Sequence, residues 1–389
     1  MNHLLGTTTI ANNGQVRFGF GAIAEIGDQL RTLGVQRPLV CSDKGLVDAG
    51  LVARLLRELP SGTAPWLFDG TPSNPTEVAV DSAAQRYRDG DCDGVIAFGG
   101  GSSLDLGKAV ALRVTHDRPL EDYTTQNAGT TRIGPVAPLI AIPTTAGTGS
   151  EVARATVLIL RNGRKRIIAS PHLVPRYSIL DPEFTMAMPA LLTAATGMDA
   201  VTHCIEAVLS PLINPPAEAI GLDGLERAIG QGALLRAVAD GNDRDARWTM
   251  MLVSTEGAMA FSKGLGAVHA MSHACGSVRA LNLHHGTLNA VLLPPVLRHN
   301  RGHCAGKYAR IASAMGLPAD SDLAAAITSL NARLGLPSGL AAMGITAQMV
   351  PALALHAVDD MCTSTNPVPL DQTAYEALFM TALEQGPHD

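Results

Sequence analysis

Two short stretches of the chain place side chains that commonly ligate metals four residues apart. One stretch, ATGMDAVTHCIEA, contains Asp199 and His203, and the other, GAVHAMSHACG, contains His269 and His273. Residues at i and i+4 lie on the same face of a helix, so each stretch is expected to present one pair of ligands. Imidazole and carboxylate groups together suit Fe(II) or Zn(II). The pattern therefore indicates a metalloenzyme.

A third histidine pair, His284 and His285, follows closely in the sequence HHG. The alternative interpretation is that these side chains only pack, since the chain has 12 histidines and a histidine in an Ala-rich helix is usually structural. A buried carboxylate such as Asp199 would still need a charged or hydrogen-bonding partner. Spacing alone leaves both interpretations open.

The bulk composition excludes several functional classes. The chain has 389 residues, of which 46% are hydrophobic and 16% charged, as in a soluble globular protein of more than one domain. A net charge of −6, without a Lys/Arg run, and 4% aromatic residues argue against nucleic-acid binding. No apolar run reaches the roughly 20 residues of a membrane span.

The sequence also predicts a cellular compartment. The first residues, MNHLLGTTTIANNG, lack the basic and apolar regions of a signal peptide. The 6 cysteines are scattered without a CxxC pair, which favours reduced thiols. We therefore expect a cytoplasmic protein, and we expect it to form a homodimer or a higher homo-oligomer.

Strand-like and helix-like stretches alternate in the first half of the chain. Short apolar runs such as PLVCS (38–42) and GVIAFGG (94–100) are each followed by an amphipathic stretch. This alternation predicts an α/β domain with a parallel sheet between helices, and Asn162-Gly163 between two apolar runs predicts a hairpin.

The pattern changes after about residue 184, where segments such as 216–238 become Ala/Leu/Met-rich with helical spacing. We therefore expect a dinucleotide-binding α/β domain over residues 1–183 and an all-helical domain, metal-binding and catalytic, over residues 184–389. A ligand of the sheet should lie at the carboxyl ends of its strands, facing the helical domain.

The stretch VIAFGGGSSLDLGKA (95–109) predicts a strand, a glycine turn and a helix. Ser102 is expected to cap this helix, with Asp105 in the capping-box position. Backbone N–H groups at such a helix start bind phosphate. The Walker A pattern does not fit, because five residues separate Gly101 from Gly107 and Ala109 follows Lys108. The GxGxxG spacing does not fit either, because Leu104 stands where the last glycine belongs. The turn suits a pyrophosphate; a tight turn that binds nothing is the alternative.

Two further positions follow strand-like runs. The loop IPTTAGTGSEVA (142–153) offers four hydroxyl groups, on Thr144, Thr145, Thr148 and Ser150. Asp43 follows the run at 38–42, where an acid can accept hydrogen bonds from a ribose and repel a 2′-phosphate. The alternative role for Asp43 is a helix N-cap.

Taken together, these motifs resemble the iron-containing (group III) alcohol dehydrogenase family. GGGSSLDLGKA, PTTAGTGSEV, TGMDAVTHCIEA and GLGAVHAMSHACG stand in that family's order and approximate spacing, and LLPPVLRHN and CTSTNPVPL resemble its later segments. The resemblance spans essentially the whole chain. It implies a Rossmann-like domain with dehydroquinate-synthase-like architecture, followed by an all-α domain.

The resemblance also implies roles for individual residues. A divalent metal, commonly Fe(II) with Zn(II) as the other option, would be bound by Asp199, His203, His269 and His285. His273 would lie by the nicotinamide in a proton path, or else orient a metal ligand. The NAD pyrophosphate would be held by Gly99, Gly100, Gly101 and Ser102. The hydroxyl loop would line the cofactor, and Asp43 would favour NAD over NADP.

Some positions depart from the family pattern. HACG replaces the common HPLG, HHG replaces PHG, and Val368 stands where many members have Arg. The segment between His273 and HHG is also longer than in typical members. His284 and His285 are therefore rival ligands, and we favour His285 because it precedes Gly286.

The predicted activity is reversible hydride transfer between a small alcohol and NAD, giving an aldehyde or ketone. One rival is a cyclising lyase resembling dehydroquinate synthase, but the basic residues near the metal motifs are sparse. A metallohydrolase is disfavoured because Ala270 stands where HExxH needs its glutamate. A non-catalytic NAD- or metal-binding protein is the third rival; it would not need both sets of motifs.

Overall fold

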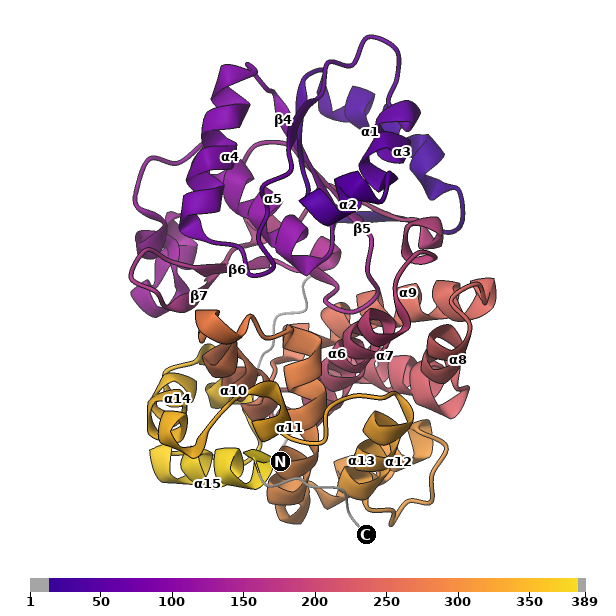
Figure 1. The fold of residues 1–389 in the computed structure, drawn as a ribbon, viewed down its shortest axis with the longest axis vertical. Coiled ribbons are helices and arrows are strands. Elements are labelled where there is room, and N and C mark those ends of the chain that lie inside the picture. The colour runs from indigo at the N-terminus through magenta and orange to yellow at the C-terminus, as the bar shows by residue number, and fades with distance from the viewer. Residues whose placement is uncertain (1–13, 384–389) are drawn as a thin grey trace.

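The computed structural model describes residues 14–383. The sequence analysis predicted from residues 1–14 that the chain has no signal peptide. This segment lies almost entirely outside the described residues. The described chain forms an α/β part and a helical part, one above the other in Figure 1. The predicted fold class is confirmed. The last strand of the sheet ends at Leu180 and the first long helix begins at Ala190, so the predicted boundary at residue 183 falls between them.

A six-stranded parallel sheet forms the centre of the α/β part. Its order is β1-β8-β5-β4-β2-β3. The strands are β1 (Gln15–Phe18), β2 (Pro38–Cys41), β3 (Trp66–Phe68), β4 (Gly94–Gly99), β5 (Leu139–Pro143) and β8 (Tyr177–Leu180). Because the strands are parallel, Asp43, the glycine turn and the hydroxyl loop all follow the same edge of the sheet.

Helices cover both faces of this sheet, as predicted. The helices are α1 (Ile26–Leu33), α2 (Lys44–Asp48), α3 (Leu51–Glu58), α4 (Glu77–Asp89) and α5 (Gly101–Arg113). Alternate residues of β4 serve opposite cores: Val95 and Ala97 pack with α4 and α5, while Ile96 and Phe98 pack with α1 and α3. A strand buried on both faces explains the continuous apolar run in the sequence.

The predicted hairpin is present beside this sheet. Its strands are β6 (Ala155–Ile159) and β7 (Lys165–Ala169), which pair antiparallel. Gly163 in the turn has a φ of 82°, a conformation that favours glycine. In Figure 1 the hairpin lies on the side of the α/β part that faces the helical part.

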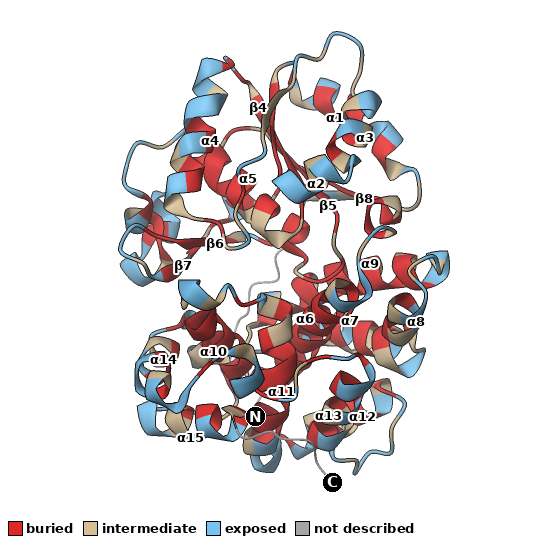
Figure 2. Cartoon of the chain, in the orientation of Figure 1, coloured by how far each residue is buried: buried red, intermediate tan, exposed pale blue. Residues whose placement is uncertain are grey.

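The helical part is built around three helices, α6, α10 and α11, which are largely buried (Figure 2). Its helices are α6 (Ala190–Leu209), α7 (Pro215–Leu225), α8 (Ala233–Ala239), α9 (Arg244–Ala260), α10 (Ala267–Gly276), α11 (His285–Asn300), α12 (Ala305–Ala314), α13 (Leu323–Arg333), α14 (Val350–Val358) and α15 (Gln372–Leu383). No described helix is long and apolar enough to cross a membrane.

The segment 216–238 is helical, as predicted, but it is not one continuous helix. A π-helical turn, Glu226–Gly230, follows α7, and Gly232 with a φ of 72° begins α8. The left-handed glycine interrupts the helical hydrogen bonds that the apolar spacing predicted. The six cysteines are free and buried, in agreement with the expectation of reduced thiols.

Candidate functional site

Four side chains from three helices of the helical part converge at one site. Asp199 and His203 come from α6, His269 from α10 and His285 from the start of α11. The Nε2 atoms of the three histidines lie 3.6, 3.9 and 3.7 Å from Asp199 Oδ1, in that order. The structure thus brings together all four residues that the sequence predicted as metal ligands.

The environment of these groups favours unprotonated imidazoles at two positions. Burial lowers the pKa of His203 to about 4, against the attraction of Asp199. Burial also lowers the pKa of His285 to well below its ordinary value, and the nearby Lys165 adds to this effect. A neutral imidazole has a free electron pair on one ring nitrogen, which a metal requires.

Neighbouring polar groups orient the rings. Glu206 Oε2 lies 2.5 Å from His269 Nδ1, and Glu206 Oε1 accepts from the backbone N–H of Val268 at 2.8 Å. Burial would lower the pKa of His269, but Glu206 outweighs it and the pKa is raised. Ser272 Oγ lies 2.8 Å from Nδ1 of His285. Each contact engages Nδ1, so Nε2 of both rings faces Asp199.

Close packing of α11 against α6 sets this geometry. A Cβ atom on Gly286 would lie 2.2 Å from the carbonyl oxygen of Ala195, so only glycine fits. The absence of a side chain lets the preceding His285 approach Asp199. The small residues of α6 therefore have a direct role in assembling the site.

His273 does not join the four donors but lies beside them. Its ring stacks on His285, with centroids 5.4 Å apart and an interplanar angle of 9°. Its Nδ1 lies 2.9 Å from Oδ2 of Asp360. Burial would raise the pKa of Asp360, but the charge and hydrogen bond of His273 lower it to about 2. His273 and Asp360 thus form a buried dyad.

Cys362 is close to this dyad, and atoms of the three groups lie within 4.8 Å of one another. Burial and the adjacent Asp360 raise the pKa of the Cys362 thiol well above its usual range, so the thiol stays protonated. With Nδ1 of His273 already engaged, a hydrogen-bonded cluster explains these residues better than a second metal site does.

The two histidines of HHG differ in their contacts. His285 points Nε2 toward Asp199, whereas the nearest hydrogen-bonding contact of His284 is Thr287, whose Oγ1 is 3.5 Å from Nδ1 of His284. His284 precedes α11 as its N-cap residue. This geometry favours His285 as the fourth donor.

The glycine turn and the hydroxyl loop pack directly against each other. A Cβ on Gly101 would lie 2.6 Å from Cγ2 of Thr148, and one on Gly100 would lie 3.3 Å from Cγ2 of Thr145. The backbone N–H of Thr144 donates to the carbonyl of Gly99 at 3.0 Å. Two loops predicted separately therefore form one surface at the strand ends.

The capping prediction at this turn was wrong. The N-cap of α5 is Gly100, and Ser102 lies in the first turn with its hydroxyl donating to the carbonyl of Ser73 at 2.5 Å. Asp105 instead accepts from the hydroxyl of Ser150 at 2.6 Å and from the N–H of Val157 at 2.9 Å. Tertiary contacts outweigh the local capping preference here.

Ser150 supports the loop from behind. Besides Asp105, its hydroxyl binds the ammonium of Lys108 at 2.9 Å. Burial lowers the pKa of Lys108 to about 8 although Asp105 and Glu151 raise it. The Ser150 side chain is thus engaged in a buried network, and its predicted contact with a cofactor stays a prediction.

Asp43 adopts the alternative role that the sequence allowed. It is the N-cap of α2, and its Oδ1 accepts from the N–H of Leu46 at 3.0 Å. Capping of α2 uses only Oδ1 of the Asp43 carboxylate. A role for the carboxylate in cofactor choice stays a prediction.

Sequence reasoning missed a buried cation between the two parts. Lys165 on β7 is 9% exposed, and its Nζ donates to Oδ1 of Asn74 at 3.1 Å. A Cβ on Gly276, at the end of α10, would lie 3.3 Å from this Nζ. The sequence RNGRKR is typical of a solvent-exposed turn, so only the structure reveals that Lys165 is buried.

Comparisons with known proteins agree with this arrangement. The family described as "Iron-containing alcohol dehydrogenase" matches residues 13–182, and its C-terminal family matches residues 193–383. A 4-hydroxybutyrate dehydrogenase of Cupriavidus necator is 48% identical over 372 residues, covering 94% of this chain and 97% of the relative.

Two solved structures extend the comparison. A 1,3-propanediol oxidoreductase is 35% identical, with a TM-score of 0.91 over 97% of this chain and 100% of that one. A sulfoacetaldehyde reductase of Bifidobacterium kashiwanohense, solved with NAD+, is 29% identical, with a TM-score of 0.87 over 98% of this chain and 100% of that one. The converging donors and the extent of these matches show that the chain belongs to the iron-containing alcohol dehydrogenase family.

Proposed function

We propose that this metal-dependent alcohol dehydrogenase holds its divalent metal with Asp199, His203, His269 and His285, and places NAD along the strand ends above them. The convergence of three histidine Nε2 atoms on Asp199 Oδ1 is the observation that supports this most strongly. The named relatives are oxidoreductases, which favours hydride transfer over the cyclising lyase.

The donor set fits a divalent cation. Three nitrogens and one carboxylate oxygen match the ligands of Fe(II) and Zn(II); Asp199, His203 and His269 are buried, and His285 is partly exposed. Glu206 and Ser272 hold two rings in the orientation that ligation requires. We favour Fe(II) because of the family, with Zn(II) as the alternative.

The surface at the strand ends fits a dinucleotide. Glycines at 99–101 expose backbone N–H groups at the start of α5, where the helix dipole favours a pyrophosphate. We propose contacts from Gly99, Gly100, Gly101 and Ser102, and a wall formed by Thr144, Thr145, Thr148 and Ser150. Asp43 would accept hydrogen bonds from the adenosine ribose with its second oxygen.

When bound, the metal would supply Lewis-acid polarisation of the alcohol oxygen, and the cofactor would supply the acceptor or donor of the hydride. The protein's own contribution is to position these groups and to move a proton. Asp360 holds Nδ1 of His273, which leaves Nε2 to take up the alcohol proton or to return it. Alternatively, His273 orients His285 through the stacking of their two rings.

The substrate we propose is a small hydroxy acid. The relative with 48% identity is a 4-hydroxybutyrate dehydrogenase, and its match covers nearly the whole chain. We also propose a cytoplasmic location and a homo-oligomer of at least two subunits. The free, buried cysteines support the former, and light scattering on the purified protein tests the latter.

The deciding experiment measures NADH and NADPH absorbance with a panel of alcohols and aldehydes. The protein is reconstituted anaerobically with Fe(II) and, separately, with Zn(II). We expect turnover with NAD and with at least one metal, and none after chelation. Equal turnover in the chelated protein would refute the metal assignment.

A further inference from the structure

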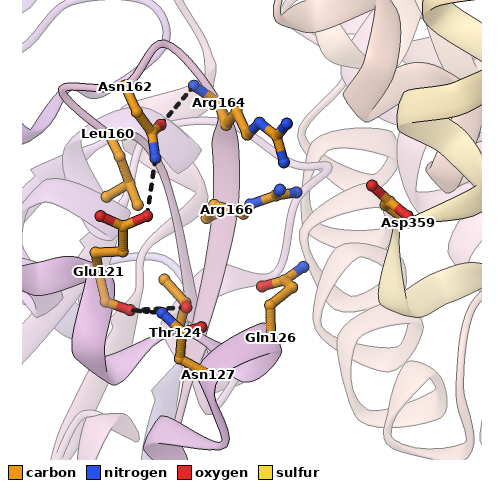
Figure 3. A pocket seen from close by; sticks show the side chains of 9 residues that line it. All are labelled: Glu121, Thr124, Gln126, Asn127, Leu160, Asn162, Arg164, Arg166 and Asp359. Atoms are coloured by element: carbon orange, nitrogen blue, oxygen red, sulfur yellow. Dashed lines mark hydrogen bonds between the residues drawn. The ribbon is translucent and has the colours of Figure 1, made fainter.

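A cavity of about 420 Å³ lies between the hairpin, the segment 121–127 and Asp359. Figure 3 shows Arg164 and Arg166 extending from β7 and the residues before it toward Asp359, which follows α14. Gln126 lines the same space. The two arginines are two residues apart on an extended segment, so they share one face of the hairpin, and Lys165 between them points to the other.

Neither guanidinium has a hydrogen bond or an ion pair within the part of the chain that the structure describes. Arg166 is only partly exposed, and burial together with the neighbouring Arg164 lowers its pKa. Arg164 is exposed, and both arginines line the same cavity. Two like charges on one cavity lining favour an anion near them. A planar carboxylate matches the geometry of guanidinium groups.

Two acidic residues also line the cavity. Glu121 accepts a hydrogen bond from Asn162 Nδ2 at 3.0 Å. Asp359 lies across the cavity without an ion pair to either arginine at 4.0 Å or less, although its charge acts on Arg166. Asp359 therefore competes with any anion that occupies the space.

One wall of the cavity lies close to the reaction site. Asp359 directly precedes Asp360, the partner of His273, and the charge of Asp360 acts on Arg166. Lys165, between the two arginines, points to the opposite face of the hairpin, where it reaches Gly276 at the end of α10. An anionic substrate held in the cavity thus lies beside the residue that precedes Asp360.

We propose that Arg164 and Arg166 capture the carboxylate of a hydroxy acid, or of the corresponding aldehyde acid, on its way to the metal. This inference rests on the proposed function and adds the residues that select acidic over neutral alcohols. A capture site acts on association, so it should change KM and leave kcat nearly unchanged.

The test compares 4-hydroxybutyrate with butane-1,4-diol, which lacks the charge. In the double variant Arg164→Gln/Arg166→Gln, we expect kcat/KM for the acid to fall by ~10-fold or more, through KM. The diol should change by less than about 2-fold. Added salt should lower kcat/KM for the acid in the wild type and have less effect in the variant.

Two further variants sharpen the test. Arg161→Gln removes a charge from the same hairpin, where Arg161 pairs with Glu77 and Asp81 outside the cavity, and should leave both substrates unaffected. Asp359→Asn removes the competing carboxylate and should lower KM for the acid. The double arginine variant should raise KM for the acid, whereas Asp359→Asn should lower it. This pair of opposite effects is specific to anion capture.

Binding of succinate, a carboxylate that cannot react, provides a readout without turnover. Calorimetry should show weaker binding to the double variant than to the wild type. Succinate should competitively inhibit turnover of the acid. If succinate also inhibits turnover of the diol by the wild type but not by the double variant, the cavity is a regulatory anion site and the proposal is overturned. Equal losses for acid and diol would overturn it as well, whereas no turnover of any alcohol by the wild type would refute the proposed function itself.

Discussion

Asn289 donates a hydrogen bond to Asp199 at the centre of the donor cluster, with 2.6 Å between Nδ2 and Oδ1. The same nitrogen lies 3.3 Å from Nε2 of His269 and 3.2 Å from Nε2 of His285. Asn289 is fully buried and is one helical turn after His285. One amide thus contacts groups from α6, α10 and α11, and it fixes the Asp199 carboxylate in the orientation seen.

Replacing Asn289 with Ala should weaken metal binding. Loss of a residue that orients a ligand typically lowers metal affinity ~10–100-fold. Competition with a chromophoric chelator measures the dissociation constant for Zn(II). Asn331→Ala is the matched control, because Asn331 is also buried but donates to the carbonyl of Ala290 at 2.7 Å. Similar affinities in the two variants would contradict an orienting role.

Replacing His203 with Ala should abolish bound metal and activity while the fold persists, because α6 has many other core contacts. The HHG pair tests the choice of the fourth donor: metal should be lost in His285→Ala and retained in His284→Ala. Metal content per chain is measured by mass spectrometry, with circular dichroism to check folding. Loss only in His284→Ala would reverse the assignment.

Asp360→Asn should lower kcat by about 10-fold or more, since the ring of His273 loses the acceptor that orients it. KM for NAD should change little. The pH profile of kcat should also shift, which a merely structural role of Asp360 would not produce. An unchanged profile would exclude the dyad from the proton path.

The same substitution has a consequence for stability in acid. The folded-state pKa of Asp360 is depressed from 3.8 to about 2, so its contribution is present above pH 4 and is lost as the pH falls toward 2. The contribution is on the order of 2 kcal/mol. The free energy of unfolding should therefore fall less steeply between pH 4 and 2 in Asp360→Asn than in the wild type. Parallel curves would show that the ion pair adds no stability.

Asp43→Gly should raise the efficiency with NADP relative to NAD by at least ~10-fold, or about 1.4 kcal/mol, by removing a charge near the 2′-phosphate. Lys44 offsets part of the repulsion, so the wild type should prefer NAD without excluding NADP. The variant also loses the cap of α2. Thr76→Ala, which removes the cap of α4, controls for that loss. An unmoved cofactor ratio would leave Asp43 as a cap only.

Local patterns in the sequence were sufficient to predict the helices and strands and the order of the motifs. Period-two and helical periodicities depend on residues close together in the chain, so the parallel sheet, the hairpin and the pairing of Asp199 with His203 followed from them. The similarity of four motifs to one family then predicted His269 and His285 as their partners. The broken helix at Gly232 was missed because one left-handed glycine outweighs a favourable apolar pattern.

Only the tertiary structure revealed the groups that position these predicted ligands. Glu206 meets His269 across 63 residues and Asp360 meets His273 across 87, so no local pattern links them. Glu206 continues the face of α6 that bears Asp199 and His203, a signal that could have been used. Arg164 and Arg166 sit in a turn-like, charged segment whose sequence predicts only solvent exposure. Their proposed role depends on the cavity that they line together with Asp359, and such a cavity exists only after distant segments have packed.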